Sequence, residues 1–221
     1  MKKFLIFFIA TFVFGGEYYA KLEPLHSYTF CSKVAGLVSF VNYEAEGKIA
    51  GNEPIVKIDD EVARLDYEVA KQTYSIKEDI YEKTSKISTK SKVEKDTQKI
   101  NYLSAKQAFI KAKDNYFSRT IKAKDLYIGD ILVEKNSFVN HGTPLFKAFD
   151  YSMAKITIFV SKDDIKAIEN KKILVNGKSD FKLHKFFSVA DTTYISSYKV
   201  ELIGPTPKLF SELVKVEIKW I

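Results

Sequence analysis

The side chains that could catalyse a reaction are scattered along the chain. Catalysis needs a nucleophile, an acid or a base that is held beside partners at a defined spacing. The three histidines, His26, His141 and His184, stand alone, without another histidine or a cysteine at the spacing of metal ligands. The single cysteine, Cys31, has no basic partner that the sequence places beside it. We therefore expect no catalytic or metal site at these residues.

Two pairs of adjacent carboxylates have a structural explanation. Asp59 with Asp60, and Asp163 with Asp164, each precede or open an expected helix, where carboxylates cap free N–H groups. The chain also lacks a glycine-rich phosphate loop, a Gly-x-Ser-x-Gly elbow and a Cys-x-x-Cys motif. We expect a protein that is not an enzyme and that uses no cofactor.

Side chains suited to binding a partner gather around residue 90. They are Ser88, Thr89, Lys90, Ser91, Lys92 and Glu94. Hydroxyl and ammonium groups can donate hydrogen bonds to carbonyl groups and carboxylates of another protein. We expect this cluster to lie at the tip of a helical hairpin.

The residues around this cluster predict that hairpin. The segment before it contains no Gly or Pro and carries apolar residues at steps of three, four or seven: Val62, Leu65, Val69, Ile76, Ile80 and Ile87. A second series follows it: Val93, Ile100, Leu103, Ile110, Phe117 and Ile121. This spacing predicts two helices of similar length in an antiparallel coiled coil, with the aliphatic series as its seam. Tyr67, Tyr74 and Tyr81 form a neighbouring stripe, and polar Gln107 and Asp114 would interrupt the seam.

Two segments on either side of the hairpin repeat one β-module. They are residues 36–59 and 129–150, and each has a β-rich run, a polar turn, a β-branched residue and a Pro-aliphatic step. Ile49 and Val139 occupy the β-branched position. A repeat that is interrupted in this way predicts one small β-domain whose two halves pair in space.

The remaining segments predict a second β-domain and an export signal. Residues 22–31 and 151–221 carry several short strands, a short helix at 162–170 and a hairpin turn at Asn176-Gly177, which together favour a β-barrel. Lys2 and Lys3 precede an apolar run that is too short to span a bilayer. We expect a secretory signal at 1–16; an uncleaved membrane tether is the alternative.

The formal net charge of +7 comes mainly from lysine, with Arg64 and Arg119 the only arginines. Lysines interspersed with Asp and Glu are typical of a solvated coiled-coil surface. Bidentate recognition of phosphates or bases favours arginine. We therefore expect no nucleic-acid partner.

The order of these segments resembles the periplasmic adaptors of efflux pumps, also called membrane fusion proteins of the HlyD/RND family. In that family the split β-domain is lipoyl-like. Residues 136–145 match its second half, with Asn136 in the first glycine position; in the first half Asn52 would adopt the left-handed turn. Residues 91–96 resemble the phrase that begins the second helix, and residues 120–124 followed by 129–131 resemble the phrase that ends it.

The resemblance implies an α+β fold with four parts. They are a signal at 1–16, a split lipoyl-like β-sandwich at 32–58 plus 126–150, an α-helical coiled-coil hairpin at 59–125, and a C-terminal β-barrel at 22–31 plus 151–221. It implies a periplasmic adaptor, associated with the inner membrane, in a homo-oligomeric ring. Its partners would be an inner-membrane RND transporter and a TolC-like outer-membrane channel that docks on the hairpin tip. The partner-binding residues there would be Ser88, Thr89, Lys90, Ser91, Lys92 and Glu94. Ser91 matches the family pattern at the tip, whereas Ile80 and Thr84 depart from its Arg and Leu.

Three alternatives stay open. The adaptor could serve an ATP-driven, ABC-type exporter. A lipoyl or biotin carrier would need a modified lysine at a tight turn of an uninterrupted domain. A structural or nucleic-acid-binding coiled coil would bind with a steep dependence on salt.

Overall fold

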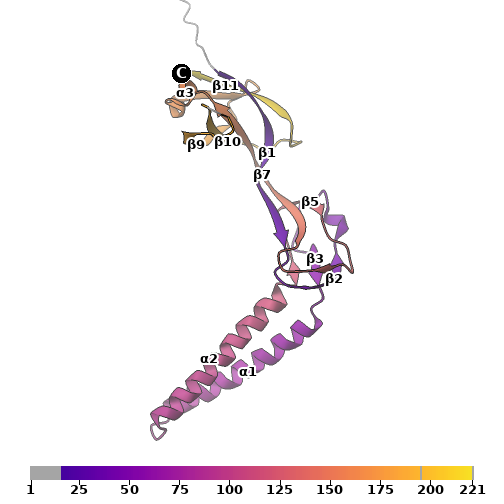
Figure 1. Cartoon of the computed structure of the whole chain (residues 1–221), viewed down its shortest axis with the longest axis vertical. Coiled ribbons are helices and arrows are strands. Elements are labelled where there is room, and N and C mark those ends of the chain that lie inside the picture. The colour runs from indigo at the N-terminus through magenta and orange to yellow at the C-terminus, as the bar shows by residue number, and fades with distance from the viewer. Residues whose placement is uncertain (1–15, 195, 221) are drawn as a thin grey trace, which may run out of the picture. The chain divides into compact units, whose positions relative to one another are not determined.

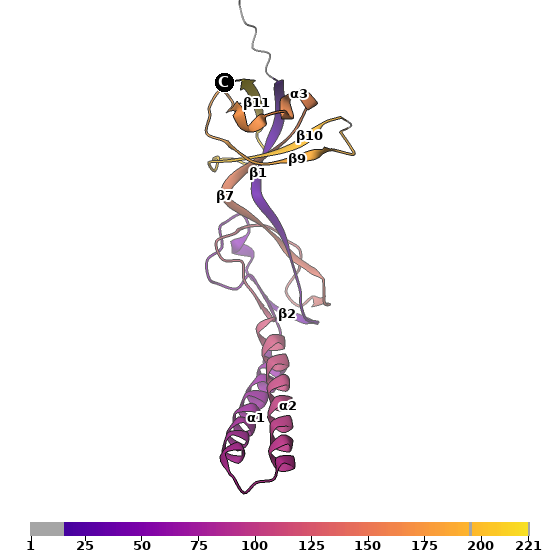
Figure 2. The same cartoon turned by 90° about the vertical axis from the view of Figure 1, so that its left-hand side faces the viewer.

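The computed structural model describes residues 16–194 and 196–220, which form two compact units. One unit comprises residues 28–149, and the other combines residues 16–27 with the described residues from 150 to 220. The expected export signal lies outside the described residues except for Gly16. Figure 1 and Figure 2 show the elements of each unit.

The helical hairpin of the first unit is confirmed. Helices α1 (Glu61–Lys86) and α2 (Lys92–Phe117) have 26 residues each, which is about 39 Å of helix at 1.5 Å per residue. They lie side by side and run in opposite directions (Figures 1 and 2). The absence of Gly and Pro from both segments lets each helix continue without a break.

The seam between the helices is aromatic, and the prediction of an aliphatic seam was wrong. Six rings alternate between the helices along the hairpin, with centroids 5.3–5.8 Å apart. In spatial order they are Tyr116, Tyr67, Phe109, Tyr74, Tyr102 and Tyr81, and we call them the ring ladder. Ala63 and Ala105 are buried beside it, and Ala70 and Ala112 are partly buried.

The physical reason is that rings alternate with small residues at heptad spacing along the seam. A ring from one helix can then pack where the other helix offers an alanine. The aliphatic residues of both series in the helices lie on other faces and keep 37–74% of their surface exposed. Gln107 and Asp114 are exposed as well, so they do not interrupt the seam.

The two halves of the β-module meet in the same unit. Strands β2 (Gly36–Val41), β3 (Val56–Ile58), β4 (Thr120–Ile121) and β6 (Phe138–Val139) form a sheet in the order β4-β3-β2-β6. Gly36 pairs with Val139, and the N–H of Val38 donates to the carbonyl of Ser137 at 2.9 Å. Strand β5 (Tyr127–Ile131) pairs with the first part of β7 (Pro144–Val160). The predicted pairing of the halves is therefore confirmed.

The core of this β-part contains residues from both halves. It includes Val38, Val41, Ile55, Val56, Ile58, Ile128, Val139, Leu145 and Phe146. Burying these side chains together stabilises the pairing, because neither half could remove its apolar residues from water alone.

Two details of the repeat were predicted wrongly. Asn136 has a left-handed backbone with φ 68° as its glycine-like position requires, but Asn52 does not, and the left-handed residue of the first half is Gly47 with φ 76°. Val139 is 2% exposed, whereas Ile49 is 64% exposed. In the first half Ala50 is buried next to Ile49, so the inward position is shifted by one residue.

The second unit is an antiparallel half-barrel. It contains β1 (Gly16–Cys31), β7, β8 (Lys171–Val175), β9 (Lys182–Ala190), β10 (Tyr198–Gly204) and β11 (Leu213–Trp220). The strand order is β8-β11-β1-β7-β10-β9, and β1 and β7 both continue into the other unit. Residues 154–160 of β7 alternate between buried and partly buried side chains, which is typical of a strand with one face on a core.

Local signals in this unit gave a correct turn but a wrong pairing. Asn176 and Gly177 have φ 48° and 80°, as a two-residue turn requires. However, β8 pairs with β11 and β9 pairs with β10, instead of β8 with β9. Asn176 explains the difference, because its N–H and its side-chain oxygen both bond to Lys215 of β11.

The predicted helix at 162–170 is divided in two. It comprises α3 (Lys162–Ile165), whose N-cap Ser161 accepts from the N–H of Asp164, and a 3-10 turn, η2 (Ile168–Asn170). Another 3-10 turn, η1 (Tyr43–Ala45), lies in the first unit. No helix in the described part of the chain is both long and apolar enough to cross a membrane.

Candidate functional site

The hairpin tip is organised by a capping box at the start of α2. The hydroxyl of Ser91 accepts from the N–H of Glu94 at 3.2 Å, and the N–H of Ser91 donates to the Glu94 carboxylate at 3.0 Å. Lys90 donates to the same carboxylate at 3.0 Å. The pKa of Glu94 lies below its ordinary value. The contact with Lys90 is the largest cause, and the bonds from Ser91 add to it. The box satisfies N–H groups that the first turn of a helix leaves free.

The six predicted tip residues therefore fall into two groups. Lys90 and Ser91 both bond to Glu94. Among the residues that the structure describes, we find no side-chain hydrogen bond or ion pair of Ser88, Thr89 or Lys92. All six are exposed, so the tip offers free donors on a loop that ends in a capping box.

The tip is also basic. Lys83 and Lys86 lie in the last turn of α1, where positive charge is favourable at the helix C-terminus. They form exposed ion pairs with Asp79 and Glu82, which contribute little to stability. Together with Lys92, they give the tip an excess of positive charge that suits a partner with carboxylate or carbonyl groups.

A hollow of about 180 Å³ beside the tip was not predicted. It is lined by Thr84, Lys90, Val93, Glu94, Thr97 and Gln98. In the sequence, Thr84 is only a departure from the family pattern. Thr97 could not be predicted as a site residue, because a lone threonine inside a helix carries no signal of binding. The hollow gives the tip a shaped surface in addition to its charge.

The opposite end of the hairpin is joined by Arg119. Its guanidinium donates to the backbone carbonyl of Asp59, just before α1, and to the side-chain oxygen of Asn115 at 3.4 Å. Its Nε is buried and has no hydrogen-bond partner among the described residues. These bonds tie the end of α2 to the start of α1, so both helices leave the β-part together.

Comparisons with known proteins agree with this geometry. Neither the family models nor the curated proteins give a match to the sequence. Among solved structures, a MacA–MexA chimeric protein with the α-hairpin domain of Pseudomonas aeruginosa MexA has a TM-score of 0.75 at 17% identity, over 96% of this chain and 83% of that one. The membrane fusion protein Spr0693 of Streptococcus pneumoniae R6 gives 0.66 at 11% identity, over 93% and 99%. The chain has the fold of a membrane fusion protein.

A third structure supports the same conclusion for the fold. MacA from Actinobacillus actinomycetemcomitans has a TM-score of 0.60 at 16% identity, over 94% of this chain and 78% of that one. The likeness to membrane fusion proteins thus extends over both units and the hairpin. It places the tip cluster at the end of an element that the fold shares.

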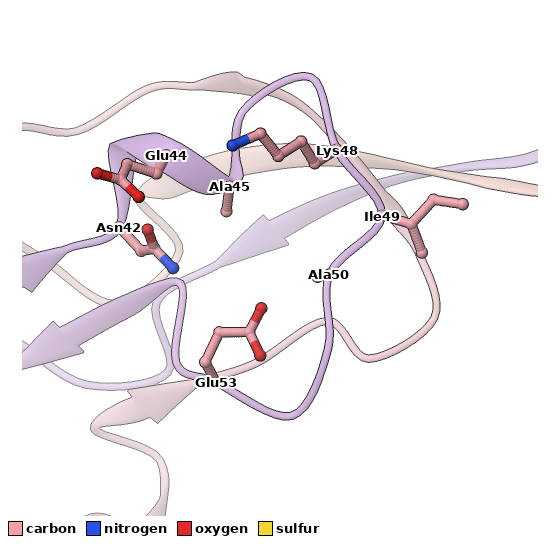
Figure 3. Close-up of a pocket in the computed structure, with 7 residues that line it drawn as sticks. All are labelled: Asn42, Glu44, Ala45, Lys48, Ile49, Ala50 and Glu53. Carbon is pink, nitrogen blue, oxygen red and sulfur yellow. The ribbon is translucent and has the colours of Figure 1, made fainter.

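Other candidate sites on this membrane fusion protein fold are weaker. One pocket has a volume of about 220 Å³ and is lined by Asn42, Glu44, Ala45, Lys48, Ile49, Ala50 and Glu53 (Figure 3). The Glu53 carboxylate accepts from its own backbone N–H and from that of Gly51, and these bonds lower the pKa of Glu53. Ile49 points away from the pocket (Figure 3). The residues that line the pocket include no His, Cys, Ser or Thr beside the two carboxylates. No group of three or more His, Cys, Asp or Glu in the described part of the chain could hold a metal ion.

Proposed function

We propose that this protein is a periplasmic adaptor of an efflux system. It links an inner-membrane transporter to a TolC-like outer-membrane channel and carries out no chemistry itself. The observation that carries the proposal is a pair of 26-residue helices that ends in an exposed, basic and rigidly capped tip, within the fold of membrane fusion proteins.

The tip is the contact with the channel. Thr89 and Lys92 would donate to carbonyl groups and carboxylates at the end of the channel, and the capping box would hold the loop in one conformation. A preformed loop loses little conformational entropy on binding, so its few polar contacts can act together. The ring ladder makes the hairpin stiff enough to hold the tip away from the β-part.

The β-units serve the other end of the bridge. We propose that several copies assemble into a ring around a conduit, in the periplasm and beside the inner membrane. An RND transporter is the proposed partner there, and an ATP-driven ABC exporter is the alternative.

The tip assignment is tested by Thr89→Asp with Lys92→Glu. The two changes put negative charge where donors are expected, and they spare the capping box; an acidic residue at 92 even favours the start of α2. We expect export of a fluorescent substrate from whole cells to fall to the level of cells without the protein.

The matched control is Ser75→Asp with Lys71→Glu, which makes the same change of charge on exposed residues along α1. This variant should export normally. Normal export by the tip variant, at equal amounts of protein in the envelope, would contradict the docking role.

A further inference from the structure

Each helix of the hairpin carries an exposed apolar stripe beside the ring ladder. The ladder contacts one of these side chains, Phe117, which packs edge-on against Tyr67 and Tyr116 and still keeps more than half of its surface exposed. The first stripe is Val62, Val69 and Ile76 on α1, and the second stripe is Leu103, Ile110 and Phe117 on α2. Their exposed fractions are 72%, 65% and 59%, and 49%, 55% and 56%. Six large apolar side chains in two regular rows are more than scattered surface residues, and such patches mark interaction surfaces.

The two stripes lie on opposite sides of the hairpin. Val69 and Ile76 each follow a tyrosine of the ladder by two positions, whereas Leu103, Ile110 and Phe117 each follow a ladder ring by one. Helical residues turn by about 100° each. The first stripe is therefore rotated by about 200° from the ladder rings of α1, and the second stripe by about 100° from those of α2. Viewed from one end of the hairpin, the two antiparallel helices turn in opposite senses, so the stripes come to lie on opposite flanks of the pair.

The stripes also match in height. Tyr67 contacts Phe109 and Tyr116, and Tyr74 contacts Tyr102 and Phe109, so residues of α1 and α2 lie level when their numbers add to about 179. By this rule Val62 is level with Phe117, Val69 with Ile110, and Ile76 with Leu103.

The next heptad step continues the match with opposite charges. It leads to Lys83 on α1 and to Asp96 on α2, which are again level. Lys83 now pairs with Asp79 on its own helix, but both side chains are mostly exposed and such a pair exchanges at little cost. Three apolar levels and one charged level therefore correspond across the two flanks.

We infer that a second copy of this chain covers each stripe: the first stripe of one copy packs against the second stripe of the next, with the hairpins parallel and Lys83 beside Asp96 of the next copy. This arrangement rests on the proposed function only in that the tips of all copies point the same way. A foreign partner would give no reason for the two flanks to correspond level by level.

The same observations disfavour a twofold dimer. Two first stripes packed together with parallel hairpins would bring Lys83 next to Lys83 and would leave both second stripes in water. The stripe-to-stripe contact is heterologous, and such contacts close into a ring when the rotation between copies allows it. This identifies the faces of the hairpin through which the proposed ring would assemble.

Disulfide trapping tests the contact in envelopes of cells that produce the whole chain. With Cys31→Ser as background, Val69→Cys and Ile110→Cys are combined in one chain. They lie on opposite flanks of one hairpin, so their disulfide joins two copies. Oxidation should produce a series of multimers whose masses are multiples of the chain mass.

The matched control combines Val69→Cys with Leu103→Cys. It exposes the same kind of residues, but the pair is displaced by one heptad, or about 10.5 Å along the helix, which exceeds the reach of a disulfide. We expect at least about tenfold less multimer from this pair. Lys83→Glu should also reduce trapping by the 69/110 pair several-fold, and Lys83→Glu with Asp96→Lys should restore it.

Four results would overturn the inference: equal trapping by both pairs, dimers from Val69→Cys alone as strong as those from the 69/110 pair, no multimer at all, or a product that contains a different protein. The tip variant Thr89→Asp with Lys92→Glu separates this from the proposed function. If it loses export while the 69/110 pair fails to link copies, the adaptor role stands and the stripe contact is wrong.

Discussion

Ser91 begins the second helix of the hairpin, and its hydroxyl is already occupied there. The bond from the N–H of Glu94 makes Ser91 a helix cap first, although the tip cluster was predicted as a binding surface. Free donors at the tip belong to its neighbours Ser88, Thr89 and Lys92. The sequence pattern Ser-x-x-Glu is itself the signal of a capping box, so the occupation of Ser91 and Glu94 could have been predicted from the residues alone.

Ser91→Ala should therefore weaken the start of α2. Loss of the cap lowers the free energy of unfolding by about 1 kcal/mol. Amide hydrogen exchange at residues 92–95 should become faster, while Ser88→Ala, which removes an exposed hydroxyl that caps nothing, should leave exchange unchanged. Equal effects of the two changes would rule out the cap.

The pH dependence of the tip follows from Glu94. Its pKa is lowered in the folded chain by Lys90 and Ser91, so its contribution to stability is present above the ordinary pKa of a glutamate and is lost as the pH falls through the lowered folded value. A carboxyl NMR titration should place the Glu94 transition below the ordinary glutamate range. In Lys90→Met the transition should move upward, and a position that does not change would contradict the assigned contact.

Asn136 carries the left-handed turn that joins the two β-halves. Its N–H donates to the carbonyl of Val38, and its φ is 68°. Asn136→Val should lower the free energy of unfolding by about 1–2 kcal/mol, because a β-branched residue is strained in this conformation. Asn136→Gly should be tolerated. Thermal denaturation of the two variants measures the difference, and equal midpoints would contradict the role of the turn.

Among the elements, the hairpin shows both the strength and the limit of sequence reasoning. Two segments without Gly or Pro, with apolar residues at heptad spacing, were enough to predict the helices and the bend. They were not enough to identify the seam, because α1 carries two heptad stripes and aliphatic residues outrank tyrosine in apolar character. The seam is determined by the alternation of rings with alanines on both helices. This alternation becomes visible only when the tyrosines of α1 (Tyr67, Tyr74 and Tyr81) are compared with the rings of α2 (Tyr102, Phe109 and Tyr116).

The ring ladder gives a prediction for adjacent residues on α2. Phe109 stacks against Tyr67 and Tyr74, whereas Ile110 is 55% exposed. Phe109→Ala should lower the free energy of unfolding of the dilute chain by about 2 kcal/mol, less than a fully buried ring because Phe109 is only partly buried. Ile110→Ala should stay within about 0.5 kcal/mol. Denaturant unfolding at low protein concentration measures both changes. A larger loss of stability for Ile110→Ala than for Phe109→Ala would show that the aliphatic residues form the seam.

At the scale of the whole molecule, the split β-module was predictable because its two halves repeat a local pattern. The strand pairing of the half-barrel was less predictable. Asn176-Gly177 gives the right turn, but the partners of β8 and β9 are set by residues far away in sequence, such as Lys215. Register in the first half of the module also depended on whether Ile49 or Ala50 points inward, and the repeat alone does not decide that.

The proposed function requires that the hairpin tip contact an outer-membrane channel while the β-units contact a transporter. The most direct test introduces a photo-crosslinking amino acid at Thr89 in producing cells and identifies the product by mass, with the same amino acid at Thr73 as control. We predict that position 89 captures an outer-membrane channel protein and that position 73 does not. Capture of no such protein from position 89, or equal capture from both positions, would contradict the adaptor function.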